Sequence, residues 1–341
     1  MIEEMAAALC AYITAHGPNR TNPQVLDLVS INAGWESDVY AFDLESGPST
    51  DRVCLPLILR IYPGDGAADK AAYEHRALTL LAAQGYPVPR VDALEIADSP
   101  FGKPFVLMER VPGVLMAHLA RDASREAQSG YLRQAIDLLV RLHRLDWRPF
   151  VADPAAFESA DGLGQVRQTL SRWERLAEPF GISSALAQLA WFSERLADVP
   201  PGRPAVIHLD YHGYNILVDA DGSATVIDWT CTEVSDPRVD LAWTLLLYHG
   251  DGPAFHDAVV REYERAAGAT AEGLDYFYAL ACWRRVWSVA IALLQGAGAV
   301  GMRPGAEETI RRSLPAVGAF YRTLAQATGV SSPEVASLLG A

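Results

Sequence analysis

A short β-hairpin is predicted in the middle of an otherwise helical part of the chain. Two β-rich runs, 216–218 and 224–227, flank the turn sequence Asp-Ala-Asp-Gly at 219–222, which is typical of a hairpin. Asn215 lies at the start of the first run and Asp228 at the end of the second. We therefore expect these two side chains to lie close together at one end of the ribbon, where they offer oxygen ligands of the kind that Mg²⁺ prefers.

A third polar residue, Asp210, precedes Asn215 by five positions within the sequence His-Leu-Asp-Tyr-His-Gly-Tyr-Asn at 208–215. Taken singly, Asp and Asn are more often turn or capping residues than ligands. Together they form the set that a phosphoryl-transfer enzyme needs, in which one Asp accepts the proton of the attacking hydroxyl while an Asn and a second Asp hold metal ions on a nucleotide triphosphate.

The pattern of residues divides the chain into a β-rich first third and a helical remainder. Strands are predicted at 25–31, 39–44, 53–62, 91–96 and 105–111, with helices at 3–16 and 67–84, and the first three strands form an antiparallel meander. Beyond Val111-Pro112-Gly113, helices are predicted at 127–145, 165–177, 184–197, 240–249, 253–267, 272–295 and 306–328. The expected fold is α+β with two lobes, at 1–111 and 112–341.

The segment around Asp210 resembles the catalytic loop of the aminoglycoside phosphotransferase family, which comprises small-molecule kinases with the protein-kinase-like fold. The family's loop usually reads His-Gly-Asp, four residues, Asn, whereas Leu209 replaces the Gly here. The family's Asp-Pro-x-x-Asp-Leu-Ala pattern is matched in full at 236–242. The resemblance implies that Asp210 is the catalytic base, that Asn215 and Asp228 bind Mg²⁺, and that the cosubstrate is ATP or GTP. It also implies that 1–111 is a nucleotide-binding lobe and 112–341 a catalytic and acceptor-binding lobe.

Two further features point to the nucleotide. The segment 32–37 joins two predicted strands, and its backbone N–H groups and the Ser37 hydroxyl are expected to face phosphates. Arg60 lies in an apolar strand, where a buried cation needs an anionic partner, and the resemblance implies that it grips phosphates and pairs with Glu74. The alternatives are a solvent-facing Arg60 and a surface pair between Glu74 and Lys70.

The predicted strand 105–111 resembles the strand that enters the kinase hinge. By position alone, the backbone of Glu109 and Val111 is expected to bind adenine. We expect Asp240 to cap the helix that is predicted to begin there. About a dozen residues separate Asp228 from this helix. The absence of a long segment there disfavours a protein substrate.

The acceptor is expected to be the hydroxyl of a small molecule, either an aminoglycoside or macrolide antibiotic or a metabolite alcohol. Residues 207–275 carry 13 acidic and 3 basic side chains, which would suit a cationic acceptor, although the same acids also serve as caps and solvated surface groups. The alternative function is a pseudokinase or binding module that holds a nucleotide without turnover.

Bulk properties exclude several other classes. A formal net charge of −14 argues against a nucleic-acid ligand, because phosphate backbones need basic surfaces. Four widely spaced cysteines without a Cys-x-x-Cys pair and an acidic N-terminus predict a cytoplasmic protein. The most apolar stretch, 286–300, is interrupted by polar residues and glycines and is predicted to be a buried core helix, with no membrane partner. Oligomeric state is not predicted.

Overall fold

The computed structural model describes residues 2–17, 21–31, 37–48, 51–159, 162–178, 183–296 and 307–341. The chain forms two compact units. Unit 1 comprises Met1–Leu115 and Ile216–Thr230, and unit 2 comprises Met116–Asn215 and Cys231–Ala341. The functional division into lobes at 1–111 and 112–341 stays a prediction.

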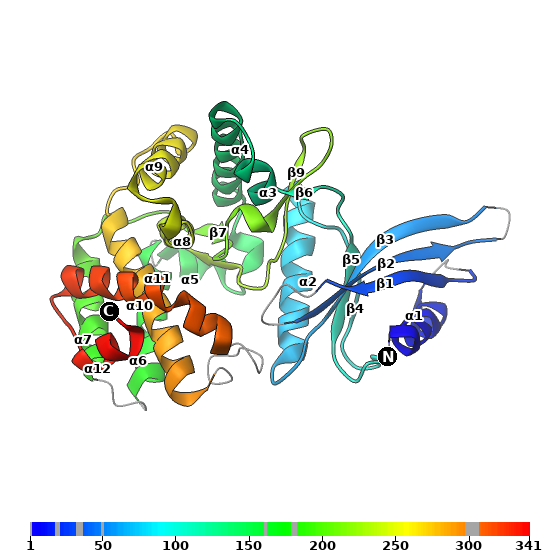
Figure 1. Cartoon of the computed structure of the whole chain (residues 1–341), viewed down its shortest axis with the longest axis horizontal. Helices are drawn as coiled ribbons and strands as arrows, with labels where there is room; N and C mark the ends of the chain where they lie inside the picture. The colour runs from blue at the N-terminus through cyan, green and yellow to red at the C-terminus, as the bar shows by residue number, and fades with distance from the viewer. Residues whose placement is uncertain are drawn as a thin grey trace. The chain divides into compact units, whose positions relative to one another are not determined.

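Unit 1 is built on a five-stranded antiparallel sheet with the order β1-β2-β3-β5-β4 (Figure 1). Its strands are β1 (Gln24–Ser30), β2 (Asp38–Ser46), β3 (Val53–Ile61), β4 (Val91–Glu95) and β5 (Phe105–Glu109). The predicted meander and all five strands are confirmed, because alternating apolar residues bounded by turn sequences give a strong local signal.

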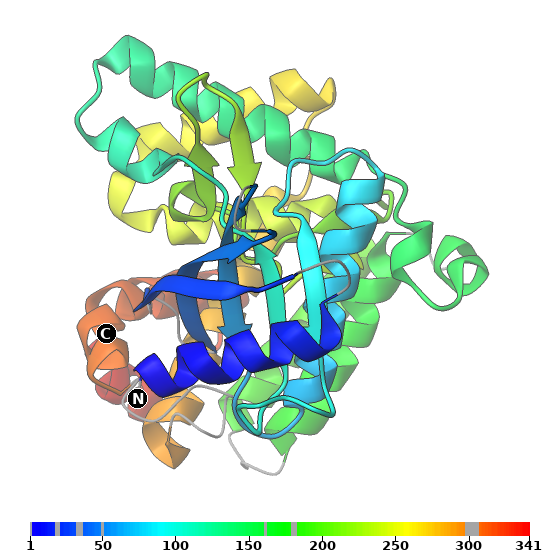
Figure 2. The ribbon, with the colours of Figure 1, turned by 90° about the vertical axis from the view of Figure 1, so that its right-hand side faces the viewer.

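Helices α1 (Ile2–His16) and α2 (Ala67–Ala83) cover opposite faces of this sheet, as Figure 2 shows. Successive side chains of a strand point to opposite faces. In β3, Leu59 packs in a core with Leu9 and Ile13 of α1, so its neighbour Arg60 faces α2. One face of β3 is thus apolar and buried against α1. The other face carries the Arg60 cation, which needs an anionic partner from α2.

A second sheet in unit 1 contains the predicted hairpin, which is confirmed. Strands β8 (Ile216–Val218) and β9 (Ala224–Val226) are antiparallel, and β8 also pairs with β6 (Val114–Leu115). The Val226 N–H donates to Pro87 O (2.9 Å), and the fully buried Trp229 packs edge-on against Tyr86. These contacts fix the hairpin and the residues that follow it onto the rest of unit 1.

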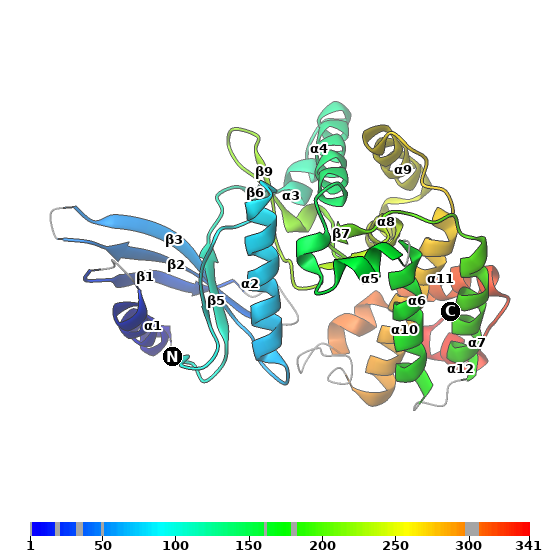
Figure 3. The same ribbon diagram turned by 180° about the vertical axis from the view of Figure 1, so that it is seen from behind.

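Unit 2 is mostly helical (Figures 1 and 3). Its helices are α3 (Met116–Arg121), α4 (Arg125–His143), α5 (Pro154–Ser159), α6 (Leu163–Ala177), α7 (Ser183–Arg195), α8 (Pro237–Leu247), α9 (Pro253–Ala267), α10 (Leu274–Gln295), α11 (Glu307–Thr328) and α12 (Pro333–Leu339), with β7 (Ala205–Ile207) pairing antiparallel with β10 (Glu233–Ser235). Each of the seven helices predicted in this region is present. The sequence missed α3, α5 and α12, since helices of six or seven residues are too short to show a helical period.

Helix α10 is the central helix of the unit 2 core. By length and composition it could cross a membrane, but 61% of its apolar window is buried inside the protein, as in the core helix of a globular fold. The predicted apolar helix is therefore found up to Gln295 and buried against its neighbours, whereas residues 297–300 lie outside the described part of the chain.

Candidate active site

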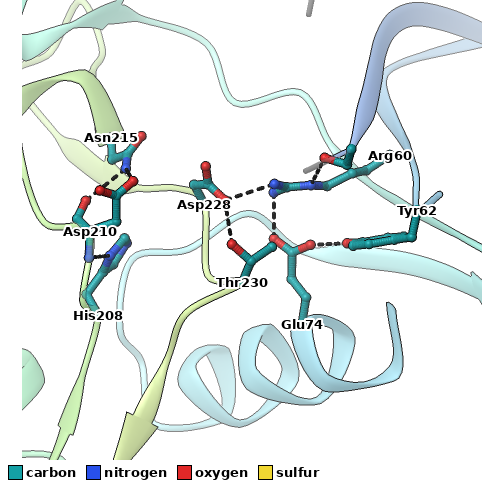
Figure 4. Close-up of polar contacts among 9 residues, drawn as sticks. Arg60, Tyr62, Glu74, His208, Asp210, Asn215, Asp228 and Thr230 are labelled. Carbon is teal, nitrogen blue, oxygen red and sulfur yellow. Dashed lines mark hydrogen bonds and ion pairs between the residues drawn. The ribbon is translucent and has the colours of Figure 1, made fainter. Parts of the chain in front are cut away.

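Arg60 is the centre of a polar network inside unit 1 (Figure 4). Its Nη1 donates to Glu74 Oε1 (2.8 Å), its Nε to Ser37 Oγ (2.8 Å) and its Nη2 to Asp228 Oδ1 (2.9 Å). The Arg60 side chain is 12% exposed and that of Glu74 1%. The predicted Arg60–Glu74 pair is confirmed, and the solvent-facing alternative is wrong because α2 covers this face of β3.

Burial and charge act against each other within this network. Burial raises the pKa of Glu74, and Arg60 and the hydrogen bonds from Tyr62 and the Trp229 backbone offset this rise only in part. Burial lowers the pKa of Arg60, but the charges of Glu74 and Asp228 reverse the effect and raise it above its ordinary value. Arg60 is thus a permanent cation, as phosphate binding requires.

Asp228 follows the hairpin in a left-handed backbone conformation, with φ of 66°. This region is unfavourable by about 1 kcal/mol or more for a residue with a side chain and is retained where surrounding contacts impose it. Here Oδ1 of Asp228 accepts hydrogen bonds from Arg60 and from Thr230 Oγ1 (3.2 Å). The side chain is 35% exposed, so the carboxylate is held from one side and reaches solvent on the other.

In unit 2, Asp210 and Asn215 contact each other (Figure 4). The Asn215 amide donates from Nδ2 to Asp210 O (2.9 Å) and to Asp210 Oδ2 (3.0 Å). A turn of 3₁₀ helix, Gly213–Asn215, makes this approach possible five residues along the chain. Because Nδ2 is used as the donor, the Asn215 Oδ1 is the atom that remains for a cation. The expected approach of Asn215 to Asp228 concerns the two different units and stays a prediction.

Two histidines close to Asp210 lower the pKa of its carboxyl group. His208 Nδ1 accepts the Asp210 backbone N–H (3.2 Å), and His212 Nε2 lies 3.6 Å from Asp210 Oδ1. Burial raises the pKa of Asp210, but the hydrogen bond and charge of His212, the charge of His208 and the Asn215 amide together hold it below its ordinary value. Asp210 is therefore ionised at neutral pH.

Asp240 binds the backbone of the same loop, a role that the sequence pattern did not predict. It is fully buried, and its two oxygens accept the backbone N–H groups of His208 and Leu209 (both 2.8 Å) and contact His143 Nε2 (3.2 Å). Leu209 has a φ of 62°, so these bonds hold a residue with a side chain in a conformation that Gly adopts more readily.

The prediction that Asp240 caps its helix is wrong. Helix α8 begins three residues earlier, at Pro237, because Asp236 caps it by accepting the Arg238 N–H (2.9 Å). Pro is favoured at the first helical position after such a cap. The buried Asp236 also forms an ion pair with Arg238 (2.7 Å). Asp240 in the first turn is thus free to bind the catalytic loop.

The remaining predicted residues lie elsewhere in unit 1. Glu109 is the last residue of β5, and its N–H donates to Arg90 O (2.9 Å). Of the backbone groups predicted to bind adenine, the Glu109 carbonyl and the Val111 peptide groups are therefore the candidates. Ser37 belongs to the Arg60 network, whereas the phosphate-facing loop predicted with it, residues 32–36, lies outside the described residues.

Comparison with known proteins shows the family to which the chain is related. A model of the phosphotransferase enzyme family matches residues 27–276, which is more than half of the chain. The chain belongs to this family. The match includes the Arg60 network as well as Asp210, Asn215 and Asp228.

Two curated relatives share sequence with this phosphotransferase-family chain. Acyl-CoA dehydrogenase family member 10 of Mus musculus is 27% identical over 243 residues, covering 68% of this chain and 21% of the relative. Acyl-CoA dehydrogenase family member 11 of Gallus gallus is 26% identical over 245 residues, covering 64% and 30%. The chain thus spans less than a third of the length of either relative.

Solved structures of the family share the fold. A Ralstonia eutropha protein described as a candidate aminoglycoside phosphotransferase superposes with a TM-score of 0.64 at 16% identity, covering 94% of this chain and 98% of that one. An aminoglycoside phosphotransferase APH(4)-Ia variant in complex with AMP-PNP and hygromycin B gives 0.52 at 18% identity, covering 90% and 98%. The GDP and kanamycin complex of APH(2″)-IIIa gives 0.58 at 15% identity, covering 89% and 96%. These likenesses establish the α+β kinase-like fold.

Proposed function

We propose that this protein transfers the γ-phosphate of ATP or GTP to a hydroxyl group of a small molecule, with Asp210 as the base. The observation that carries the proposal is the Asp210–Asn215 contact, in which Asn215 fixes an ionised carboxylate through its Nδ2. An aspartate held in this way can orient an acceptor hydroxyl and take its proton. Relatives with the same fold bind AMP-PNP or GDP together with antibiotics, which supports a nucleotide cosubstrate and a small acceptor.

Asn215 and Asp228 are proposed to hold Mg²⁺. Among the described residues no group of three His, Cys, Asp or Glu side chains gathers to form a protein-only metal site. Mg²⁺ often takes only one or two protein oxygens and completes its shell with phosphates and water, so one carboxylate and one amide fit this ion. When bound, the ion neutralises charge on the transferred phosphoryl group.

The residues have separate tasks in the proposed reaction. Arg60 offers its charge to the nucleotide phosphates, and Glu74 keeps that cation in place. Asp210 orients the acceptor hydroxyl in line with the γ-phosphorus and receives its proton as the new P–O bond forms and the β–γ bridging bond breaks. We propose a cytoplasmic location, where thiols such as these four cysteines, none of which forms a disulfide, stay reduced.

Replacement of the base tests the proposal. We expect Asp210→Asn to lower kcat by roughly 10²–10⁴-fold, the usual contribution of general acid–base catalysis, while nucleotide affinity stays within about twofold. Turnover is measured by nucleotide consumption across aminoglycosides, macrolides, sugars, hydroxy acids and amino alcohols. Asp198→Asn, at an exposed aspartate of unit 2, is the matched control and should retain full turnover.

Two results would contradict the proposal. Transfer that survives Asp210→Asn would remove Asp210 as the base. Nucleotide binding by the unaltered protein without transfer to any acceptor would favour a binding module instead.

A further inference from the structure

Unit 2 contains a cavity of about 160 Å³ beside the catalytic loop. Its walls come from α6, β10, α8 and α10, together with Leu209 of the loop. Leu209 immediately precedes Asp210, and Arg285 of α10 interacts electrostatically with Asp210. One part of the cavity wall is therefore formed by the residue that precedes the proposed base, within unit 2.

The size of the cavity limits what it can hold. An engineered apolar cavity of about 150 Å³ binds benzene, whereas pockets for drug-sized ligands are about 300–1,000 Å³. The Leu209 side chain is 5% exposed and forms part of the wall, so it fills space that a glycine would leave open. The enclosed part suits a single ring or a short chain and is too small for a whole antibiotic.

The charged groups of the wall determine which chemistry fits. Arg172, Arg284 and Glu233 line the cavity, and no ion pair within 4.0 Å is found for any of them among the described residues. Two cations against one anion leave the wall with a positive charge. Burial raises the pKa of Glu233, although Arg284 and Arg172 oppose this rise.

Aromatic groups supply the rest of the wall. Trp173, Trp243 and Phe277 line the cavity, and the Arg284 guanidinium lies 4.6 Å from the centre of the Trp243 ring. The Trp243 side chain is 8% exposed, and its Nε1 has no hydrogen-bond acceptor in the described part of the chain. Hydrogen-bond donors and cations thus outnumber acceptors around an apolar space.

We propose that this cavity receives the acceptor and that the acceptor is a small hydroxylated carboxylate with an aromatic or short apolar group. Arg284 and Arg172 bind the carboxylate, the aromatic wall packs against the apolar group, and Leu209 limits its size. This assignment rests on the proposed phosphoryl transfer: the acceptor oxygen forms a bond to the γ-phosphorus, the nucleoside diphosphate leaves, and Asp210 takes the hydroxyl proton.

The overall acidity of the region 207–275 does not make this cavity favour a cationic ligand. Of the 13 acidic residues in that region, Glu233 alone contributes to the cavity wall.

Binding of charge-matched probes tests the inference without turnover. Isothermal titration with benzoate, benzyl alcohol and benzylamine compares one ring with three charges. We expect benzoate to bind at least about tenfold more tightly than benzylamine, because its carboxylate accepts charged hydrogen bonds from the cavity arginines, whereas an ammonium group is repelled by them. Equal or tighter binding of benzylamine would overturn the proposal.

Variants locate the site. Arg284→Gln should weaken benzoate binding by roughly tenfold and leave benzyl alcohol unchanged. Arg172→Gln, at an exposed residue, should act in the same direction. Arg195→Gln, at an arginine that is 60% exposed and lies outside the cavity wall, is the control and should change neither. Leu209→Gly should admit 2-naphthoate. Unchanged benzoate affinity in both cavity arginine variants would overturn the proposal.

A transfer assay separates this inference from the proposed function. With 4-(hydroxymethyl)benzoate and 4-(hydroxymethyl)benzylamine as acceptors, we expect phosphorylation of the acid. Phosphorylation of the amine alone would leave the kinase assignment intact and refute the carboxylate. Arginine-dependent binding of benzoate with no transfer to any acceptor would refute the kinase assignment and retain the carboxylate site.

Discussion

Arg60 shows at the scale of single residues what the sequence reveals and what it does not. A cation in an apolar strand demands a partner, and the family resemblance pointed to Glu74 as that partner. The ion pair with Asp228 could not, since that residue is 168 positions away and no local pattern links the two. The approach of His212 to Asp210 (3.6 Å) is likewise not a local pattern, because it depends on the course of the loop.

Removal of Arg60 should expose the cost of a buried carboxylate. We expect Arg60→Met to lower the free energy of unfolding by about 3–5 kcal/mol at pH 8, because Glu74 loses its counter-charge. Without Arg60, burial keeps the folded-state pKa of Glu74 above the unfolded value. The loss should therefore be smaller at pH 5, where the proton neutralises Glu74 more readily, and grow as the pH rises. Chemical denaturation at the two pH values measures it.

The double variant Arg60→Met/Glu74→Leu is the control for this prediction. Replacing both members of a buried pair with apolar residues removes the unpaired charge, so stability should recover in part. A double variant as unstable as the single one, with no dependence on pH, would show that lost packing rather than charge causes the effect.

Asp228 is proposed to act on the metal rather than on the fold of its unit. We expect Asp228→Asn to weaken nucleotide binding by tenfold or more in the presence of Mg²⁺, since a neutral amide is a poorer ligand for a hard cation, and to have little effect without Mg²⁺. Titration with a fluorescent nucleotide at several Mg²⁺ concentrations checks this. The same loss of affinity in the presence of EDTA would contradict the metal role.

At the scale of elements, the catalytic loop depends on helix α8. The sequence predicted the helix but not its start, because the Asp-Pro pair at 236–237 marks a helix N-terminus that was assigned to Asp240 instead. The hydrogen bonds that Asp240 makes to residues 208 and 209 span about 30 positions. Helical periodicity identifies elements, whereas such contacts between elements are fixed only by tertiary packing.

Asp240→Asn should therefore weaken both the loop and the fold. An amide has one acceptor oxygen, so one of the two backbone N–H groups loses its partner, at a cost of about 3 kcal/mol. Burial raises the pKa of Asp240, but His143, His208 and the backbone N–H hold it below its ordinary value. Its contribution is therefore present at neutral pH and lost as the pH falls through the folded-state pKa.

Denaturation at pH 7 and pH 3 checks this prediction. The difference in stability between the unaltered protein and Asp240→Asn should shrink at the lower pH, and kcat should fall because Asp210 is less well positioned. Asp198→Asn provides the comparison at an exposed site. A difference that stays constant with pH would contradict the charged role of Asp240.

At the scale of the whole molecule, the chain crosses between its two units three times. It leaves unit 1 after Leu115, returns for residues 216–230 and leaves again. The sequence predicted the α+β class and the helical content, because both depend on local periodicity. The sequence pattern did not predict that residues 216–230 belong to unit 1, because the pairing between β6 and β8 is not a local property.

This interleaving predicts which fragments fold. Residues 1–115 alone lack β8, β9 and Trp229. Tyr86 therefore loses its contact with the Trp229 ring, and the Pro87 carbonyl loses the hydrogen bond from the Val226 N–H. Because Leu115 pairs with Leu217, a glycine-rich linker of about four residues can join 115 to 216 as a hairpin loop. We expect the linked fragment to unfold cooperatively in urea and fragment 1–115 to unfold with a lower midpoint and a smaller m-value. Identical transitions would show that the hairpin adds nothing to unit 1.

The Arg60 side chain is already committed through Nε, Nη1 and Nη2 to Ser37, Glu74 and Asp228. An incoming phosphate competes for the Arg60 charge with Asp228, which is the most exposed of these three partners. A cation that draws this carboxylate away would release the guanidinium for the phosphate at the same moment. Nucleotide and divalent ion are then expected to bind as a single cooperative species, with the free nucleotide a poor competitor against its chelate.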